Sequence, residues 1–269
     1  MLAMIGLSGC HENAADGKGS ARPKLVRPGA IRLMPWNIYR GKLGLDGLAN
    51  VIKTEKPDIV LLQEVLRPEF APAGVDQAAD LAERIGGLRV YSLNSLRVGN
   101  VHKYGDPAIL SRWPLKDVVV IDAGDGGRAY AMSATVDLPG PPLHVISVHA
   151  NGTFKMEVRH VFESATARSR QIDDLIDRVK TKPGTVLIGG DFNTPEWMPE
   201  FRRMCEAWTD LGRANDPSLM TMPSNRPALR IDYVFASGAG IRAKSYRVIA
   251  TEASDHCPVV VDLDVSEEF

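Results

Sequence analysis

Short apolar runs recur along the chain from Ala30 onward, and glycine, proline or polar residues bound each of them. Runs of this kind predict β-strands separated by turns. The 24 glycines and 18 prolines are spread along the chain, which indicates many turns and disfavours an all-helical fold. We predict strands at residues 31–37, 58–63, 89–92, 108–111, 118–122, 129–137, 143–149, 185–189, 231–236, 243–248 and 258–264.

Four amphipathic segments predict helices, at residues 45–54, 77–85, 157–180 and 200–207. The longest has apolar residues at steps of three and four along one face, so it should lie on a sheet: Val158, Val161, Phe162, Ala165, Ile172, Leu175, Ile176 and Val179. Many strands with few helices favour two β-sheets packed face to face over a βαβ repeat. The expected fold class is therefore α/β (α+β), a four-layer sandwich of two packed mixed β-sheets flanked by helices.

The composition of the 269-residue chain does not change after residue 30, so we expect one domain at residues 30–269. The polar, turn-rich residues before it predict an N-terminal tether at residues 1–29. A hydrophobic content of 44% is enough for a core, which excludes disordered, collagen-like and coiled-coil classes. The net charge of -1 creates no overall field for nucleic acid, although a basic patch within a cleft stays open.

The N-terminus contains a sequence, Leu7-Ser8-Gly9-Cys10, that resembles the lipobox at the end of a bacterial lipoprotein signal peptide. Nine residues precede Cys10 and none is lysine or arginine, whereas a signal peptide normally has a basic end. Two alternatives stay open. We expect an extracytoplasmic protein with a lipid anchor on Cys10 that associates with a membrane; the alternative is a cytoplasmic protein with an unmodified terminus.

The three cysteines are too few for a disulfide scaffold and too scattered for a zinc site. Any metal must therefore be held by oxygen and imidazole ligands. Whether Cys205 and Cys257 pair with each other stays open. The sequence has no run of 18 apolar residues, so no transmembrane helix is expected.

One glycine-rich segment, from Gly124 to Ala129, has the spacing of a dinucleotide-binding loop. Such a loop must lead into a helix, but residues 130–138 are typical of a strand, so the segment predicts a hairpin turn. The sequence has no Walker A motif, no Gly-x-Ser-x-Gly and no His-Glu-x-x-His. The sequence therefore lacks the motifs on which serine-nucleophile and zinc-protease chemistry usually depend.

Polar residues stand at the ends of six otherwise apolar strands. They are Asn37, the pair Gln63 and Glu64, the pair His149 and Asn151, the pair Asp191 and Asn193, Asp232, and the pair Asp255 and His256. A strand end can direct a side chain into a cleft while its apolar neighbours stay in the core. Each residue alone has a structural explanation, but together they predict a site.

In this order, Gln63-Glu64, Gly190-Asp191-x-Asn193 and Ser254-Asp255-His256 resemble the endonuclease/exonuclease/phosphatase superfamily, the deoxyribonuclease I-like fold. The resemblance runs from about Ile31 to Leu263, and linking segments agree with it: Leu110-Ser111-Arg112, the pair Arg168 and Gln171, and Thr221 ahead of Arg230-Ile231-Asp232-Tyr233. It implies a divalent-metal-dependent phosphoesterase in which an activated water attacks phosphorus in line.

Four carboxylates, those of Glu64, Asp191, Asp232 and Asp255, would repel one another if a cleft gathered them without compensation. A bound cation would reverse that repulsion. Hard oxygen ligands suit Mg²⁺ or Mn²⁺, and Ca²⁺ stays open.

The resemblance also implies a role for each residue. Glu64 and Asn37 would bind the metal, and Asp255 would ligate it or support a ligand. Asp191 and Asn193 would position the attacking water and the phosphate.

His256, oriented by Asp232, would act as general base or stabilise the transition state. His149 would contact the scissile phosphate or protonate the leaving group. Arg128 and Asn151 are the expected substrate-binding residues, with an arginine exposed in a turn as the alternative for Arg128.

We expect a monomer acting on a phosphodiester, with DNA or RNA first and a sphingomyelinase-like or other lipid or small-molecule phosphodiester second. A catalytically inactive binding protein of the same fold is the alternative from another class. Four short basic segments could hold a nucleic-acid backbone: residues 39–42, 102–104, 202–203 and 225–226.

Overall fold

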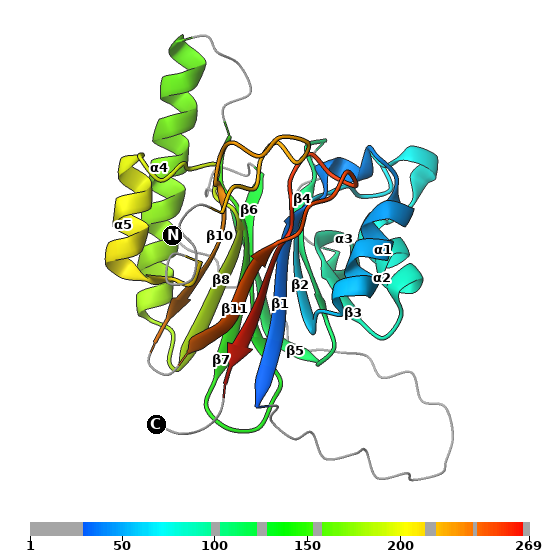
Figure 1. Cartoon of the computed structure of the whole chain (residues 1–269), viewed down its shortest axis with the longest axis horizontal. Helices are drawn as coiled ribbons and strands as arrows, with labels where there is room; N and C mark the ends of the chain where they lie inside the picture. Colours follow the sequence, from blue (N-terminus) through cyan, green and yellow to red (C-terminus); the bar gives the residue numbers. More distant parts are fainter. Residues whose placement is uncertain are drawn as a thin grey trace.

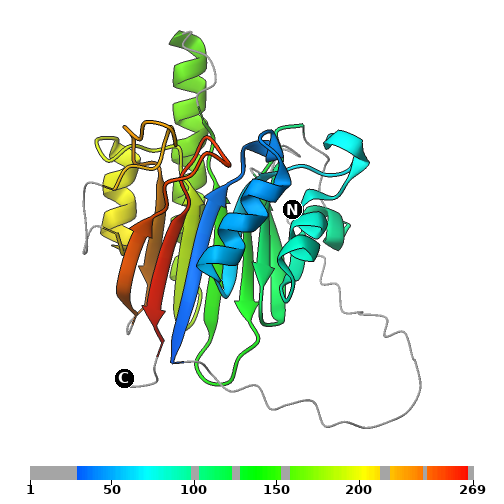
Figure 2. The same cartoon turned by 45° about the vertical axis from the view of Figure 1, so that its right-hand side comes forward.

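The computed structural model describes residues 29–97, 103–122, 128–152, 158–212, 219–238 and 241–265. It confirms the predicted fold class, because two mixed six-stranded sheets pack face to face between two layers of helices (Figures 1 and 2). Cys10 and the rest of the predicted tether before Gly29 lie outside the described residues, so the lipid anchor stays a prediction. Within the described part of the chain, no helix is long and apolar enough to cross a membrane.

The first sheet has the strand order β11-β12-β1-β2-β4-β3. Strands β1 and β2 are parallel, and every other pair of neighbouring strands in this sheet is antiparallel. Three helices, α1 (Leu45–Glu55), α2 (Gln77–Ile85) and the short α3 (Leu93–Leu96), lie on its outer side, on the right of Figure 1. The strands are β1 (Ala30–Asn37), β2 (Ile59–Val65), β3 (Arg89–Ser92), β4 (Asp106–Ser111), β11 (Arg242–Val248) and β12 (Val259–Asp264).

The second sheet has the order β5-β6-β7-β8-β10-β9, and its β7 and β8 are parallel. The long helix predicted over residues 157–180 is α4 (Val158–Lys180), which covers the outer side of this sheet together with α5 (Pro199–Ala207) (Figure 1). The strands are β5 (Leu115–Asp122), β6 (Ala129–Val136), β7 (Leu143–His149), β8 (Thr185–Asp191), β9 (Thr209–Asp210) and β10 (Asp232–Ser237).

All eleven predicted strands and four predicted helices are present, with ends that differ by a few residues. Sequence analysis did not predict β9, because two residues are too few for a recognisable period. The segment after the glycine-rich motif is strand β6, as expected, and not a helix. Gly124 to Gly127 lie outside the described residues, so the turn itself is not tested.

The strands are apolar on both faces because each sheet is covered on both sides. Leu33 of β1 and Leu61 of β2 belong to the core between the sheets, whereas their neighbours Met34 and Leu62 pack toward α1 and α2. Successive side chains of a strand point to opposite faces, so a strand buried on both sides is apolar throughout.

One glycine allows the close approach of β7 and β8 just below the carboxyl end of β8. Gly190 has φ of +143°, and a Cβ there would lie 2.1 Å from the carbonyl oxygen of Val148. Neither the conformation nor the space suits another residue.

We predict that Gly190→Ala lowers the free energy of unfolding by about 3–5 kcal/mol, the sum of backbone strain and overpacking. Gly86→Ala is the matched control, since Gly86 has φ of +78° and a Cβ added there would meet nothing within 4 Å. It should cost only the backbone strain, about 1–3 kcal/mol. Urea denaturation measures both, and equal losses would contradict the close contact at Gly190.

Candidate active site

The site lies at one end of the space between the two sheets, at the upper edge of Figure 1. Strands β1, β2, β7 and β8 end there and β10 begins there. Asn37, His149, Asp191 and Asp232 continue the inward-facing series of their strands, two or four residues beyond a core residue. Since the inner faces oppose one another, these last polar side chains converge.

Asp191 is the buried centre of this group. Its Oδ2 accepts hydrogen bonds from Asn37 Nδ2 at 3.0 Å and from Asn193 Nδ2 at 3.1 Å. The same oxygen lies 3.6 Å from His149 Nε2 and 3.9 Å from His256 Nε2. Burial raises the pKa of the Asp191 carboxyl, and the charge of His256 opposes this. One carboxylate oxygen therefore faces donors from both sheets.

A tight turn after β8 sets the orientation of Asp191. The backbone N–H of Asn193 donates to Asp191 Oδ1 at 2.8 Å, and Asn193 itself has φ of +49°, a conformation that asparagine tolerates well. Asn193 Nδ2 also donates to the carbonyl oxygen of Ala150 at 3.1 Å. This contact ties the turn after β8 to the segment after β7.

His256 pairs with Asp232 as the sequence predicted, with 2.9 Å between His256 Nδ1 and Asp232 Oδ2. Burial alone would lower the pKa of His256, but the charges of Asp232 and Asp191 outweigh it and raise the pKa to about 10. The two carboxylates therefore favour the imidazolium form of His256. Trp36 Nε1 holds this loop by donating to the carbonyl oxygen of His256 at 2.9 Å.

The surroundings of His149 shift its pKa in the opposite direction. Burial, followed by the positive charges of Arg128, His256 and Arg40, holds the pKa of His149 well below its ordinary value. Arg128 Nη2 contacts His149 Nδ1, and Arg128 Nε donates to the carbonyl oxygen of Gly105 at 3.2 Å. Because arginine can only donate, His149 Nδ1 accepts and the ring proton is on Nε2, facing Asp191. Arg128 thus lies in the site and not in an exposed turn.

Glu64 also lies near Nε2 of His149, with 3.9 Å between Glu64 Oε1 and that nitrogen. The φ of Glu64 is +57°. A Cβ at Gly105 would lie 2.4 Å from the Glu64 carbonyl carbon, so the backbone at Glu64 requires a glycine at position 105. Arg40 Nε lies 3.0 Å from Glu64 Oε2. Sequence analysis considered Arg40 only as a backbone contact for nucleic acid and did not predict its pairing with Glu64.

Below the site, Gln63 and Ser147 join the two sheets. Gln63 Nε2 donates to Ser147 Oγ at 3.0 Å, and Ser147 Oγ donates to the carbonyl oxygen of Leu62 at 2.9 Å. All of these atoms are buried. The bonds fix the spacing of β2 and β7 directly under Glu64 and His149.

The remaining predicted residues lie at the rim. Asp255 is half-buried, with Oδ1 3.4 Å from Ser254 Oγ, and burial raises its pKa. Asn151 is half-buried, and its backbone is held by α4: its N–H donates to Gln171 Oε1 at 2.7 Å and its carbonyl oxygen accepts from Arg168 Nη1 at 3.3 Å. The Arg168 and Gln171 pair singled out in the sequence therefore positions this loop.

The donor set suits a hard divalent cation. Within the described part of the chain, ligand atoms of Asp191, Asp232 and His256 lie within 4.8 Å of one another. Glu64 Oε2 is a further buried oxygen, with no hydrogen bond of good geometry. Asn37 contacts Asp191 and the Tyr39 backbone, and Asp255 lies outside the three-residue group, so the metal roles predicted for these two residues stay predictions.

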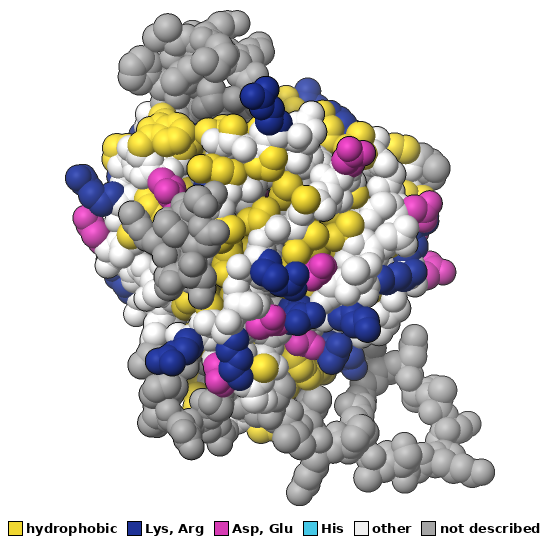
Figure 3. Space-filling model, in the orientation of Figure 1, with side chains coloured by type: hydrophobic (Ala, Val, Ile, Leu, Met, Phe, Trp, Pro, Cys, Tyr) yellow, Lys and Arg dark blue, Asp and Glu magenta, His cyan; other side chains and the backbone are white. Residues whose placement is uncertain are grey.

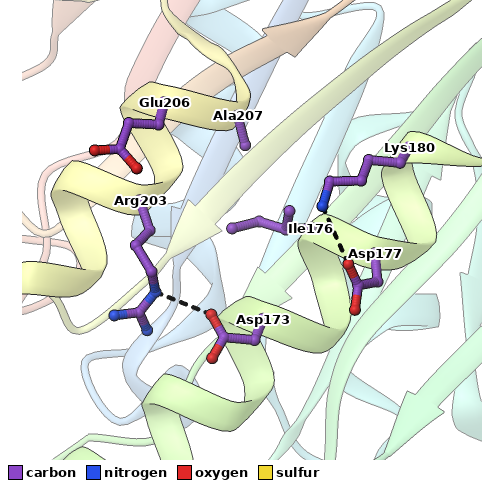
Figure 4. A pocket seen from close by; sticks show the side chains of 7 residues that line it. All are labelled: Asp173, Ile176, Asp177, Lys180, Arg203, Glu206 and Ala207. Carbon is purple, nitrogen blue, oxygen red and sulfur yellow. Dashed lines mark hydrogen bonds and ion pairs between the residues drawn. The ribbon is translucent and has the colours of Figure 1, made fainter.

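A separate groove of about 460 Å³ lies between α4 and α5 (Figure 4). Its charges are paired, with Arg203 Nε 2.9 Å from Asp173 Oδ1 and Lys180 Nζ 3.2 Å from Asp177 Oδ1. Arg203, from one of the basic segments proposed as a phosphate contact, is therefore engaged in an ion pair away from the site. His102 of another segment lies outside the described residues.

The geometry agrees with comparisons to known proteins. The model of the Endonuclease/Exonuclease/phosphatase family matches residues 36–256. A UPF0294 protein of Vibrio vulnificus is 22% identical over 260 residues, which cover 94% of this chain and 81% of the relative.

Two solved structures are similar in fold. An endonuclease/exonuclease/phosphatase from Beutenbergia cavernae has a TM-score of 0.67 and 26% identity, covering 88% of this chain and 72% of its own. TDP2 of D. rerio, complexed with a single strand DNA product, has a TM-score of 0.68 and 16% identity, covering 88% of this chain and 100% of its own.

We predict that Asp232→Asn lowers the pKa of His256 in the metal-free protein, because it removes the negative charge hydrogen-bonded to Nδ1. NMR titration of the imidazole in chelator measures the change. Asp255→Asn, which removes a weaker and more distant influence, should cause a smaller fall. An unchanged His256 titration in Asp232→Asn would assign the raised pKa to Asp191 instead.

Proposed function

This chain belongs to the endonuclease/exonuclease/phosphatase family, and on that premise we propose that it hydrolyses a phosphodiester, with DNA or RNA as the substrate class. The observation that carries the proposal is the buried Asp191 carboxylate between two histidines whose pKa values are shifted in opposite directions. Environments that separate the pKa values of neighbouring groups are typical of acid-base sites.

In the proposed reaction, Asp191 accepts a proton from the attacking water. Burial raises the pKa of this carboxyl, which makes it a stronger base than an exposed aspartate. Asp232 and Asp191 raise the pKa of His256, which supports a role for this side chain as a hydrogen-bond donor to the phosphoryl oxygens. Of the two roles that the sequence left open for His256, the proposal therefore takes transition-state stabilisation.

His149 and Arg128 would contact the same phosphate beside Asp191 and His256. Neutral His149 offers its Nε2–H, while the Arg128 guanidinium supplies a positive charge beside it. As water oxygen bonds to phosphorus and the bond to the leaving oxygen breaks, charge gathers on the phosphoryl oxygens. Preorganised donors would stabilise that charge. Asn193 would keep Asp191 in position throughout.

A divalent cation, Mg²⁺ or Mn²⁺, is part of the proposal. Glu64 is the expected ligand, with Asn37 and Asp255 as further oxygen donors. When bound, the cation supplies neutralisation of the phosphate charge and orientation of its oxygens. The oxygen-rich donor set and the buried carboxylate of Glu64, whose Oε2 forms an ion pair with Arg40, support this assignment.

The nucleic-acid substrate is supported by fold similarity to TDP2 bound to a single strand DNA product. Every position of the predicted catalytic set holds a residue able to do the chemistry, which argues against an inactive binding protein. A lipid or small-molecule phosphodiester stays the alternative substrate, and a lipid anchor on Cys10, which lies outside the described residues, would favour it.

We predict that Asp191→Ala or His256→Ala lowers kcat for bis(p-nitrophenyl) phosphate by at least about 100-fold, because each removes a group that acts on the reacting atoms. Circular dichroism checks that the variants stay folded. Asp177→Asn is the control, since that side chain is 77% exposed on α4 and pairs with Lys180. Turnover by Asp191→Ala at the wild-type rate would rule out the assignment.

We also predict that EDTA abolishes hydrolysis and that Mg²⁺ or Mn²⁺ restores it. Glu64→Gln should weaken binding of Mn²⁺, measured by titration calorimetry without substrate, because it removes a carboxylate charge from the site. Full activity in chelator would exclude metal from the reaction. Unchanged Mn²⁺ affinity in Glu64→Gln would place the ion elsewhere.

A further inference from the structure

Large exposed apolar side chains are concentrated at the edge of the sandwich that carries the site. Six such side chains occur among the described residues, and five of them lie on loops at this edge: Leu43, Phe70, Tyr104, Trp197 and Met220. The sixth, Val119, lies within strand β5 at the border of the second sheet. Figure 3 shows hydrophobic side chains across the upper part of the visible face, toward this edge.

The register of the strands places these residues. Leu43 and Phe70 follow β1 and β2, whose parallel ends carry Asn37 and Glu64. Tyr104 precedes β4, which begins opposite the end of β2.

On the second sheet, Met220 precedes Thr221, whose hydroxyl lies 3.3 Å from the Asp232 backbone nitrogen. Trp197 follows Asn193 by four residues, so its Cα lies at most about 14 Å from that of Asn193.

Trp197 is the most exposed of the five, at 71%, although the segment that carries it is firmly held. The carbonyl oxygen of Thr194 accepts from Tyr233 Oη at 2.8 Å, and Glu196 Oε1 accepts from Arg230 Nη1 at 2.8 Å. The N–H of Met198 closes a turn by donating to the carbonyl oxygen of Pro195 at 3.0 Å. An indole presented on an anchored turn loses little conformational entropy on contact with a ligand.

Cations accompany the aromatic rings at this edge. Lys42 Nζ lies 4.0 Å from the centroid of the Tyr39 ring, and Lys103 Nζ lies 5.2 Å from that of Tyr104. Aromatic platforms combined with basic groups are the means by which proteins hold single-stranded nucleic acid, because every base has a face that can stack.

We propose that Trp197 stacks on an unpaired nucleobase next to the phosphate that Asp191 and His256 would contact. The inference rests on the proposed function and narrows its substrate to strands with unpaired bases. A base within a duplex presents no free face to the indole, so duplex substrates need a frayed end or a single-stranded stretch.

Fluorescence anisotropy tests the proposal, with His256→Ala as the background so that the strand is not cleaved. The ligands are a labelled oligothymidine and an abasic strand of equal length, which keeps the phosphates but has no bases. We expect the background protein to prefer oligothymidine by about 10-fold, as one stacked base provides. Adding Trp197→Ala should reduce the preference to less than about 2-fold, whereas Trp197→Phe should keep most of it.

Val119→Ala is the matched control, because it removes an exposed apolar side chain outside this edge and should leave the preference intact. An undiminished preference in Trp197→Ala would overturn the proposal. So would a selective loss of binding to phosphatidylglycerol vesicles with oligothymidine binding unchanged, which would assign Trp197 to a lipid surface. Failure to bind either strand would also overturn it, while hydrolysis of bis(p-nitrophenyl) phosphate would show separately whether the phosphoesterase activity stands.

Discussion

The Asp191 carboxylate is buried between two sheets, and the arrangement of the site follows from the need to compensate the cost of burying this charge. An unpaired buried carboxylate costs several kcal/mol even after relaxation. Here the amides of Asn37 and Asn193 donate to one oxygen, and the backbone of Asn193 donates to the other. The two nearby histidines complete the surroundings. The same contacts that make burial tolerable also orient the carboxylate toward the space where a phosphate would be held.

These contacts require the strands of the two sheets to be positioned accurately at the edge that carries the site. The hydrogen bond between Gln63 and Ser147 sets the distance between β2 and β7. Gly190 lets β8 approach β7, and Gly105 lets the chain pass close to the backbone of Glu64. Each of these features lies within a few residues of the site, yet none of them takes part in chemistry. They act by placing side chains from strands far apart in the sequence at hydrogen-bonding distance.

The electrostatics of the two histidines illustrate why identity alone does not assign a role. His149 ends the apolar strand β7, His256 lies just ahead of the apolar strand β12, and both are buried in the structure. His256 has Asp232 on its Nδ1, and the charges of Asp232 and Asp191 raise its pKa. His149 has Arg128 on its Nδ1, and burial together with that positive charge lowers its pKa. Burial lowers the pKa of both rings, and the sign of the neighbouring charges decides whether that effect is reversed. The sequence did not indicate these opposite shifts.

The sequence by itself determined the elements and the members of the site. Apolar strands that end in polar residues predicted Asp191, Asp232, His149 and His256, because a strand end is where a sheet can expose a polar group at little cost to its core. Only the tertiary structure decided what those residues face. The pairing of Arg40 with Glu64, the placement of Arg128 in the site and the gathering of exposed apolar residues at one edge all depend on contacts between distant segments. Strand periodicity is a local property that the sequence records directly, whereas the register between sheets is a product of packing.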